Sequence, residues 1–116
     1  MISTTVRNFV KSQRVRVRHF HDTRTWQLLA TIARVDLTNG NILCAVSRCR
    51  VGPQGDTPSR SSGYELAVTR LAMALAGHEQ PNEVFQTNFK KYLSEFKDVS
   101  DKRSLAHALR SSNINA

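Results

Sequence analysis

Arginine residues alternate with valines in a short stretch near the beginning of the chain. Arg14, Arg16 and Arg18 are separated by single valines, and in an extended strand such residues point to the same face. The planar guanidinium group forms paired hydrogen bonds with phosphate or carboxylate oxygens. This spacing therefore predicts a strand face that binds an anion.

The basic charge of the chain is concentrated in its first half. The 116 residues carry a formal net charge of +8 at pH 7. Residues 1–50 contain nine Lys and Arg against two Asp, whereas residues 51–116 contain eight Lys and Arg against seven acidic residues. A surplus confined to one segment favours recognition of a polyanion, either nucleic acid or a nucleotide. The alternative is a solvated basic face without a partner.

A second group of anion-binding residues lies at the start of a predicted helix. A loop rich in Gly and Pro, residues 52–60, precedes Ser62 and Glu65, which have the spacing of a capping box. The free N–H groups and the positive dipole end of a helix start attract anions, and Ser59 and Arg60 would lie there. The alternative is an ordinary capped helix start.

The sequence has no recognisable catalytic or metal-binding arrangement. His19 and His21 face the same way on the predicted strand without a third ligand nearby, and Cys44 and Cys49 lack the spacing of a metal site. Neither a Walker loop nor a dinucleotide fingerprint is present. We therefore expect a protein that is not an enzyme and uses no metal or other cofactor. Both cysteines are expected to be reduced thiols.

Two predicted hairpins position the arginines. Asn39-Gly40 lies between two apolar runs and predicts a two-residue turn, which pairs Leu37 with Ile42. A second turn, centred on Asp22-Thr23, pairs the strand over residues 14–20 with the same middle strand. The register of both hairpins then follows from the turn lengths.

Together the hairpins place arginines from the first and third strands on one face of the sheet. A one-residue slip of the first strand would put its arginines among core residues, which burial disfavours. Trp26 and His19 are expected on the opposite face, with Trp26 in the core. The predicted phosphate-binding site comprises Arg14, Arg16, Arg18, Thr31, Arg48, Arg50, Ser59 and Arg60.

Helical periodicity in the second half of the chain completes an α+β prediction. A helix from Ser62 to Gly77 would cover the core face, a second would start at Asn82 and include Phe85, and a short third would start at Ser100. The predicted fold is a three-stranded antiparallel β-meander packed by a helix and followed by two C-terminal helices. It forms a single domain, residues 1–116, with 1–12 as a loose arm or short helix and 111–116 as a frayed tail.

An apolar strip on the predicted arginine face needs a cover. Either the C-terminal helices fold across this strip or a second subunit does, which would make the protein a homo-oligomer. The strip comprises Ala33, Val35, Leu37, Ile42, Cys44 and Val46.

Membrane association is not expected. No apolar run approaches the roughly 18 residues that span a bilayer, and residues 1–10 lack the apolar segment of a signal peptide. The expected location is the cytoplasm.

Residues 56–70 resemble a pattern found in small, mostly uncharacterised proteins encoded by bacteriophages and prophages. In those proteins a basic, apolar hairpin precedes Asp, an aromatic residue or Pro, Ser-Arg or Ser-Lys, two residues, Gly, and a Leu-Ala-x-x-Arg helix opening. They often carry Gly-Arg where this chain has Gly63-Tyr64. The resemblance implies an accessory protein that acts inside the bacterial host cell and counteracts host machinery or defence.

A second likeness is to double-stranded-RNA-binding domains. In these domains a leading helix and three strands precede a helix whose basic start contacts phosphates. The Ser-Arg-Ser-Ser stretch at residues 59–62 occupies the position of that helix start. This likeness also implies a nucleic-acid ligand.

The competing hypothesis is an inhibitor of a host protein. Its arginine face would bind an acidic surface of a defence complex or a nucleic-acid-processing protein, with Trp26 or Tyr64 as an aromatic anchor if exposed. An enzyme acting on nucleic acid would instead need acidic groups beside the arginines. Asp22 and Asp36 lie at opposite ends of the predicted sheet, which argues against such an enzyme.

Overall fold

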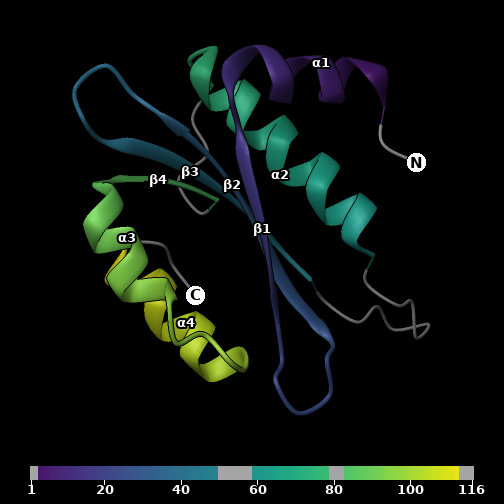
Figure 1. Ribbon diagram of the computed structural model, residues 1–116, viewed down its shortest axis with the longest axis vertical. Coiled ribbons are helices and arrows are strands. Elements are labelled where there is room, and N and C mark those ends of the chain that lie inside the picture. The colour runs from purple at the N-terminus through teal and green to yellow at the C-terminus, as the bar shows by residue number, and fades with distance from the viewer. Residues whose placement is uncertain (1–2, 50–58, 79–82, 113–116) are drawn as a thin grey trace.

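The chain folds into one antiparallel sheet with helices on both sides (Figure 1). The computed structural model describes residues 3–49, 59–78 and 83–112. The strand order is β1-β2-β3-β4. In chain order the elements are α1 (Thr4–Gln13), β1 (Arg16–His21), β2 (Leu28–Asp36), β3 (Ile42–Arg48), α2 (Arg60–Leu75), β4 (Val84–Thr87), α3 (Phe89–Phe96) and α4 (Lys102–Ser111).

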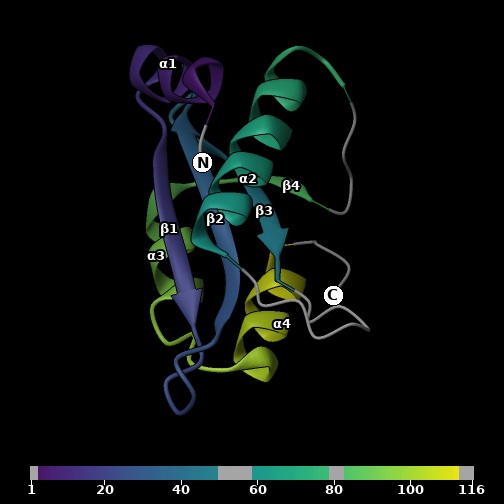
Figure 2. The ribbon, with the colours of Figure 1, turned by 90° about the vertical axis from the view of Figure 1, so that its right-hand side faces the viewer.

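The sheet is the middle of three layers. Helices α1 and α2 lie on one side of it, and α3 and α4 lie on the other (Figure 2). Each side has its own apolar cluster. The α2 side includes Ala33, Ala45 and Leu71, and the α3 and α4 side includes Ile32 and Phe96.

The α+β class is confirmed, but the sheet has one strand more than predicted. Phe85, which was predicted to lie in a helix, lies in β4. The helix that follows, α3, begins only at Phe89. Asn88 caps α3, its side-chain oxygen accepting a hydrogen bond from the backbone N–H of Lys91 at 2.7 Å. The predicted cap Asn82 lies outside the described residues.

Of the two alternatives for residues 1–12, a loose arm or a short helix, the structure has the helix, α1. Ser3 caps it, accepting a hydrogen bond from Val6 N–H at 3.2 Å. With α1 in place, the first five elements follow the order helix, three strands, helix.

The cap of helix α2 lies three residues before the predicted cap Ser62. Ser59 is the cap, because its hydroxyl oxygen accepts a hydrogen bond from Ser62 N–H at 3.0 Å. The predicted end is confirmed: α2 stops at Leu75, and Gly77 has the left-handed φ of 94° that is typical after a helix.

The β2–β3 hairpin has a three-residue loop, and its predicted register was wrong by one residue. Leu37 N–H donates to the Asn41 carbonyl at 2.8 Å, and Gly40 lies between them with φ 85°. A three-residue loop with glycine in the left-handed conformation is a common hairpin connection. Val35 therefore pairs with Leu43 instead of Cys44.

The register of β1 against β2 also differs from the prediction. Arg16 pairs with Arg34, and a bulge separates Phe20 from His21. The connection is longer than two residues: Asp22 N–H donates to the Gln27 carbonyl at 2.8 Å. This shift moves Thr31 to the face opposite Arg16. Trp26 lies in the loop and is 69% exposed, so its predicted place in the core was wrong.

Helices of the same chain cover the apolar strip on the face of Arg16. Only half of the residues predicted for this strip lie on that face. Ile42, Cys44 and Val46 are buried with residues of α3 and α4. Ala33 and Val35 lie on the other side, against α2. Intramolecular helices therefore cover the strip for which a second subunit was the alternative.

Candidate functional site

A row of cationic side chains follows the outer strand of the sheet. Arg16 and Arg18 alternate with half-buried residues along β1, and both are exposed. Register places Arg34 of β2 directly beside Arg16, on the face that α3 and α4 cover farther in. Because β1 is the edge strand, the side chains of Arg16 and Arg18 lie beyond the part of the sheet that α3 and α4 cover, and they are exposed. We call the surface formed by Arg7, Lys11, Arg14, Arg16, Arg18 and Arg34 the basic edge.

Aromatic rings of α3 support the inner part of the basic edge. The Arg34 guanidinium carbon lies 4.6 Å from the centre of the Phe89 ring and 5.8 Å from that of Tyr92. The Arg18 guanidinium carbon lies 4.6 Å from the Phe20 ring centre. Such contacts hold a guanidinium in place while leaving its edge available for hydrogen bonds. Phe89 is 41% exposed and remains accessible beside Arg34.

Tyr92 contributes an uncharged hydroxyl to this region. Burial raises the pKa of Tyr92 to about 12, and nearby Cys44 adds to the rise while Arg18 and Arg34 oppose it. The hydroxyl is therefore protonated at neutral pH. It leaves the positive charge of the neighbouring arginines uncompensated.

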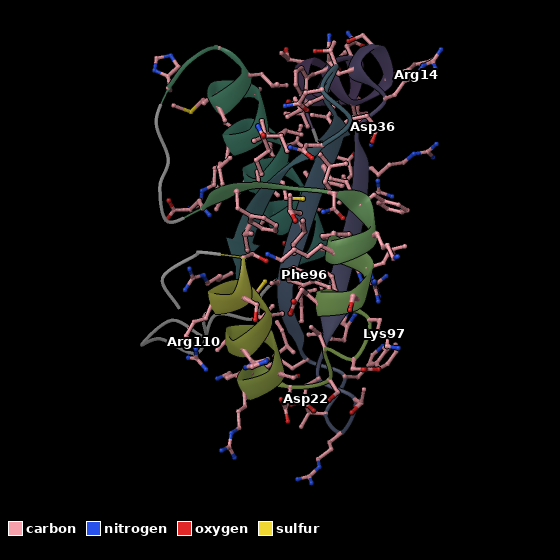
Figure 3. The ribbon with its side chains drawn as sticks, turned by 90° about the vertical axis from the view of Figure 1, so that its left-hand side faces the viewer. Arg14, Asp22, Asp36, Phe96, Lys97 and Arg110 are labelled. Atoms are coloured by element: carbon pink, nitrogen blue, oxygen red, sulfur yellow. The ribbon has the colours of Figure 1, made fainter. Side chains whose placement is uncertain are left out.

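At the α1 end, the basic edge widens into a shallow hollow of about 420 Å³. Arg14 is the C-cap of α1 and has a left-handed φ of 54°. Figure 3 shows its side chain pointing away from the protein. The hollow is lined by Arg7, Val10, Lys11, Arg14, Val15, Arg16 and Tyr64.

No described residue neutralises the basic edge. In the described ranges 3–49, 59–78 and 83–112, no carboxylate forms a salt bridge with any of its six cations. Asp36, at the end of β2, is exposed and lies in the same region of Figure 3 as Arg14, but the two are not paired. An unpaired row of cations attracts anions from solution.

The structure separates the predicted site residues into groups. Arg14, Arg16 and Arg18 share the basic edge. Thr31 is fully buried on the other face, where its hydroxyl oxygen lies 2.8 Å from His19 Nδ1, so its predicted place on the arginine face was wrong. The cause is the wrong pairing of β2 in both hairpins.

Arg48 shares the face of Arg16 but not its edge. It pairs with Ala30 at the end of β3, two strands away, and is half-buried. Arg50 lies outside the described residues. Neither residue is placed in the basic edge.

Ser59 and Arg60 form a separate group on the α2 side of the sheet. Arg60 donates from Nε and Nη2 to His21 Nε2, at 3.3 and 3.1 Å. The His21 ring stacks on Trp26, with ring centres 5.0 Å apart. Burial and then the Arg60 charge lower the pKa of His21, which favours the neutral ring that accepts these hydrogen bonds.

Two positions of the phage-type pattern have structural roles here. Gly63 is buried against β2, where a Cβ would lie 2.6 Å from the hydroxyl oxygen of Thr31. Arg70 Nη1 donates to the Val46 carbonyl at 2.7 Å. Both positions therefore help to pack α2 on the sheet.

Sequence reasoning missed Arg7, Lys11, Arg34 and Phe89. Arg7 and Lys11 lie four residues apart, a spacing that puts them on one side of a helix, but this signal requires α1 to be recognised first. Arg34 interrupts an apolar run in β2. Phe89 has no local signal, because only tertiary packing brings it to Arg34.

The described residues give little support for metal binding or for catalysis by a cysteine nucleophile. Within the described residues, no group of three or more His, Cys, Asp or Glu side chains could hold a metal ion. Burial raises the pKa of the Cys44 thiol to about 12 and also raises that of Cys49, so neither is an activated nucleophile.

Comparison with known protein families, curated proteins and solved structures finds no match to this chain. In the part of the chain that the structure describes, no helix is long and apolar enough to cross a membrane.

Proposed function

We propose that the protein binds nucleic acid through the basic edge. The observation that supports this is a row of cations that have no carboxylate partner among the described residues, from Arg7 and Lys11 in α1 to Arg18 in the middle of β1. Guanidinium groups match phosphate oxygens, and the exposed ring of Phe89 offers a face for an unpaired base. A binding role also agrees with the absence of an activated nucleophile among the described cysteines.

The form of the basic edge favours an extended polyanion over a small nucleotide. A captured nucleotide needs cations that converge on one enclosed pocket. Here the cations are spread along an edge strand, and the hollow at its α1 end is shallow and open. One phosphate could lie in this hollow while its neighbours contact Arg16 and Arg18.

The test is the salt dependence of binding. Each neutralised phosphate of a single strand changes the slope of log K against log salt by about 0.7. The double variant Arg16→Gln/Arg18→Gln should therefore bind a fluorescent oligonucleotide more weakly, with a slope shallower by about 1.4. Fluorescence anisotropy at several salt concentrations measures both quantities.

A matched control removes the same charge elsewhere. Arg103 and Arg110 are exposed on α4, and Figure 3 shows Arg110 on the opposite side of the view from Arg14. The variant Arg103→Gln/Arg110→Gln should retain both affinity and slope. Equal losses in the two double variants would mean that only net charge matters, and would contradict a specific role for the basic edge.

A second candidate function is binding to an acidic surface of a host protein. Trp26 is 69% exposed, as this hypothesis requires of its aromatic anchor, and exposed arginine and aromatic residues are common in interface hot spots. Affinity capture from a bacterial lysate, with and without nuclease, separates the two. A protein that is retained after nuclease treatment, and lost with Arg16→Gln/Arg18→Gln, would favour the inhibitor.

The phage-type pattern at residues 56–70 supports a role in infection. A nucleic-acid-binding accessory protein could counteract host defence by shielding phage nucleic acid. The test is plaque formation on a bacterial host with nucleic-acid-sensing defence, with the protein expressed in trans. Protection by the wild type, and none by Arg16→Gln/Arg18→Gln, is the expected result.

A further inference from the structure

The β1–β2 hairpin carries an aromatic residue whose exposure the core does not explain. Trp26 is 69% exposed and has a left-handed φ of 61°, a conformation that is rare for bulky residues. Most Trp side chains are largely buried. This one instead stacks on His21, with the two rings inclined by only 13°.

Hydrogen bonds hold the hairpin end in one conformation. Trp26 N–H donates to the Asp22 carbonyl at 2.8 Å, and an Asp22 carboxylate oxygen accepts from Arg24 N–H at 2.8 Å and Thr25 N–H at 3.1 Å. Thr23 N–H donates to the Ser100 carbonyl at 2.9 Å, which ties the loop to the segment before α4. The ring is thus presented to solvent by an ordered loop.

Arg60 completes the group at the edge of the His21 ring. It uses Nε and one Nη2 hydrogen on His21 Nε2, and a guanidinium has five N–H donors in all. No described residue occupies the remaining donors, which can bind an anion. His21 therefore joins a flat, exposed aromatic face to a guanidinium with free donors.

We propose that Trp26, His21 and Arg60 form a binding site for one unpaired nucleobase and its phosphate. The base stacks on the open face of Trp26, and Arg60 binds the phosphate. This inference rests on the proposed function, since a strand bound along β1 would reach this hairpin at the end of the strand opposite the hollow. It adds a specific expectation: the protein prefers nucleic acid with unpaired bases.

The surroundings of Trp26 favour a base over a protein partner. Hot-spot aromatics in protein interfaces lie among other apolar groups that exclude water. The loop neighbours of Trp26 are Thr23, Arg24 and Thr25, all exposed and polar. A lone flat ring beside a cation is instead typical of sites where bases stack.

The chain contains a single Trp, so its intrinsic fluorescence reports on this site directly. The probes are single-stranded oligothymidylate and an abasic deoxyribose-phosphate oligomer of equal length. Oligothymidylate should quench Trp26 fluorescence in a saturable way, whereas the abasic oligomer should bind without quenching. Trp26→Ala should weaken oligothymidylate binding by about tenfold or more, the value of one stacked base, and leave abasic binding unchanged.

Control variants keep the result interpretable. Trp26→Phe should bind oligothymidylate more tightly than Trp26→Ala, and Met73→Ala, which truncates an exposed side chain on α2, should bind as the wild type does. Circular dichroism confirms the fold of each variant. Arg60→Gln should weaken binding of both probes.

The experiment distinguishes failure of the base site from failure of the proposed function. If Trp26→Ala binds both probes as tightly as the wild type and no quenching occurs, the base site is overturned while the basic edge stands. If the wild type binds neither probe, the proposed function fails and this inference with it. A protein captured from lysate only when Trp26 is present, with unchanged oligonucleotide affinity in Trp26→Ala, would overturn the base site in favour of protein recognition.

Discussion

Gly63 of α2 lies so close to Thr31 of β2 that a Cβ at Gly63 would be 2.6 Å from the Thr31 hydroxyl oxygen. Real Cβ atoms do not approach other atoms this closely, so α2 can pack at this depth only with glycine here. Thr31 is fully buried. The contact fixes the distance between α2 and the sheet, and with it the place of Arg60 beside His21.

Gly63→Ala should therefore destabilise the protein, by about 1–3 kcal/mol as for other overpacked sites. Urea unfolding measures the loss. In Gly63→Ala/Thr31→Ala the hydroxyl is gone and the added methyl has space, so the two changes should cost less together than the sum of the single variants. Strict additivity would mean that the contact does not limit packing.

Arg34 and Phe89 should be coupled energetically. Their cation–π contact joins β2 to α3 at a partly exposed site, where such contacts contribute about 0.5–1 kcal/mol. A double-mutant cycle with Arg34→Gln and Phe89→Leu measures this coupling, because leucine keeps the apolar volume but lacks the ring face. Zero coupling would indicate that Arg34 is positioned by Tyr92 alone.

Gly40 provides a test of the three-residue hairpin loop. Its φ of 85° is unfavourable for residues with a side chain, although no atom lies within 4 Å of a Cβ built there. Gly40→Ala should cost about 1 kcal/mol for conformational reasons alone, and Gly40→Asn should cost less because asparagine tolerates this conformation. Thermal unfolding of the two variants ranks them. Equal stability of alanine and glycine would contradict this turn geometry.

The folded state should become less stable in mild acid. Burial, and then the Arg60 charge, lower the pKa values of His19 and His21 from 6.5 in the folded protein. Below that value the unfolded chain binds more protons than the native state, so the free energy of unfolding falls as the pH decreases. Denaturant titrations between about pH 7 and about pH 5 measure the slope.

The histidines themselves provide the control for this pH dependence. His19→Gln/His21→Gln should flatten the slope, since both shifted groups are removed. His78→Gln/His107→Gln changes two exposed histidines and should leave the slope as in the wild type. A slope that is unaffected by the first pair would assign the acid sensitivity to other groups.

Local signals predicted the elements better than their pairing. The strand that contains Arg16 to Phe20, the helix ending before Gly77 and the Asn39-Gly40 turn lie where the sequence indicated, although Arg14 caps α1 instead of opening the strand. Pairing failed because it depends on loop length, and neither the left-handed Trp26 nor the bulge beside His21 has a clear local signature. One register error placed the side chains of β1 on the wrong face relative to β2, and the other did the same for β3. They cancelled, so Arg16 and Arg48 were correctly placed on one face for the wrong reason.

By itself, the sequence determined an α+β chain with alternating arginines on an amphipathic strand, because residue type and period are local properties. The tertiary structure alone decided which cations meet: it turned Thr31 inward, brought Phe89 to Arg34 and left Trp26 in solvent against His21. The physical reason is that strand register and helix docking are set by contacts between residues far apart in the chain. A change of one residue in a loop reverses every side chain beyond it.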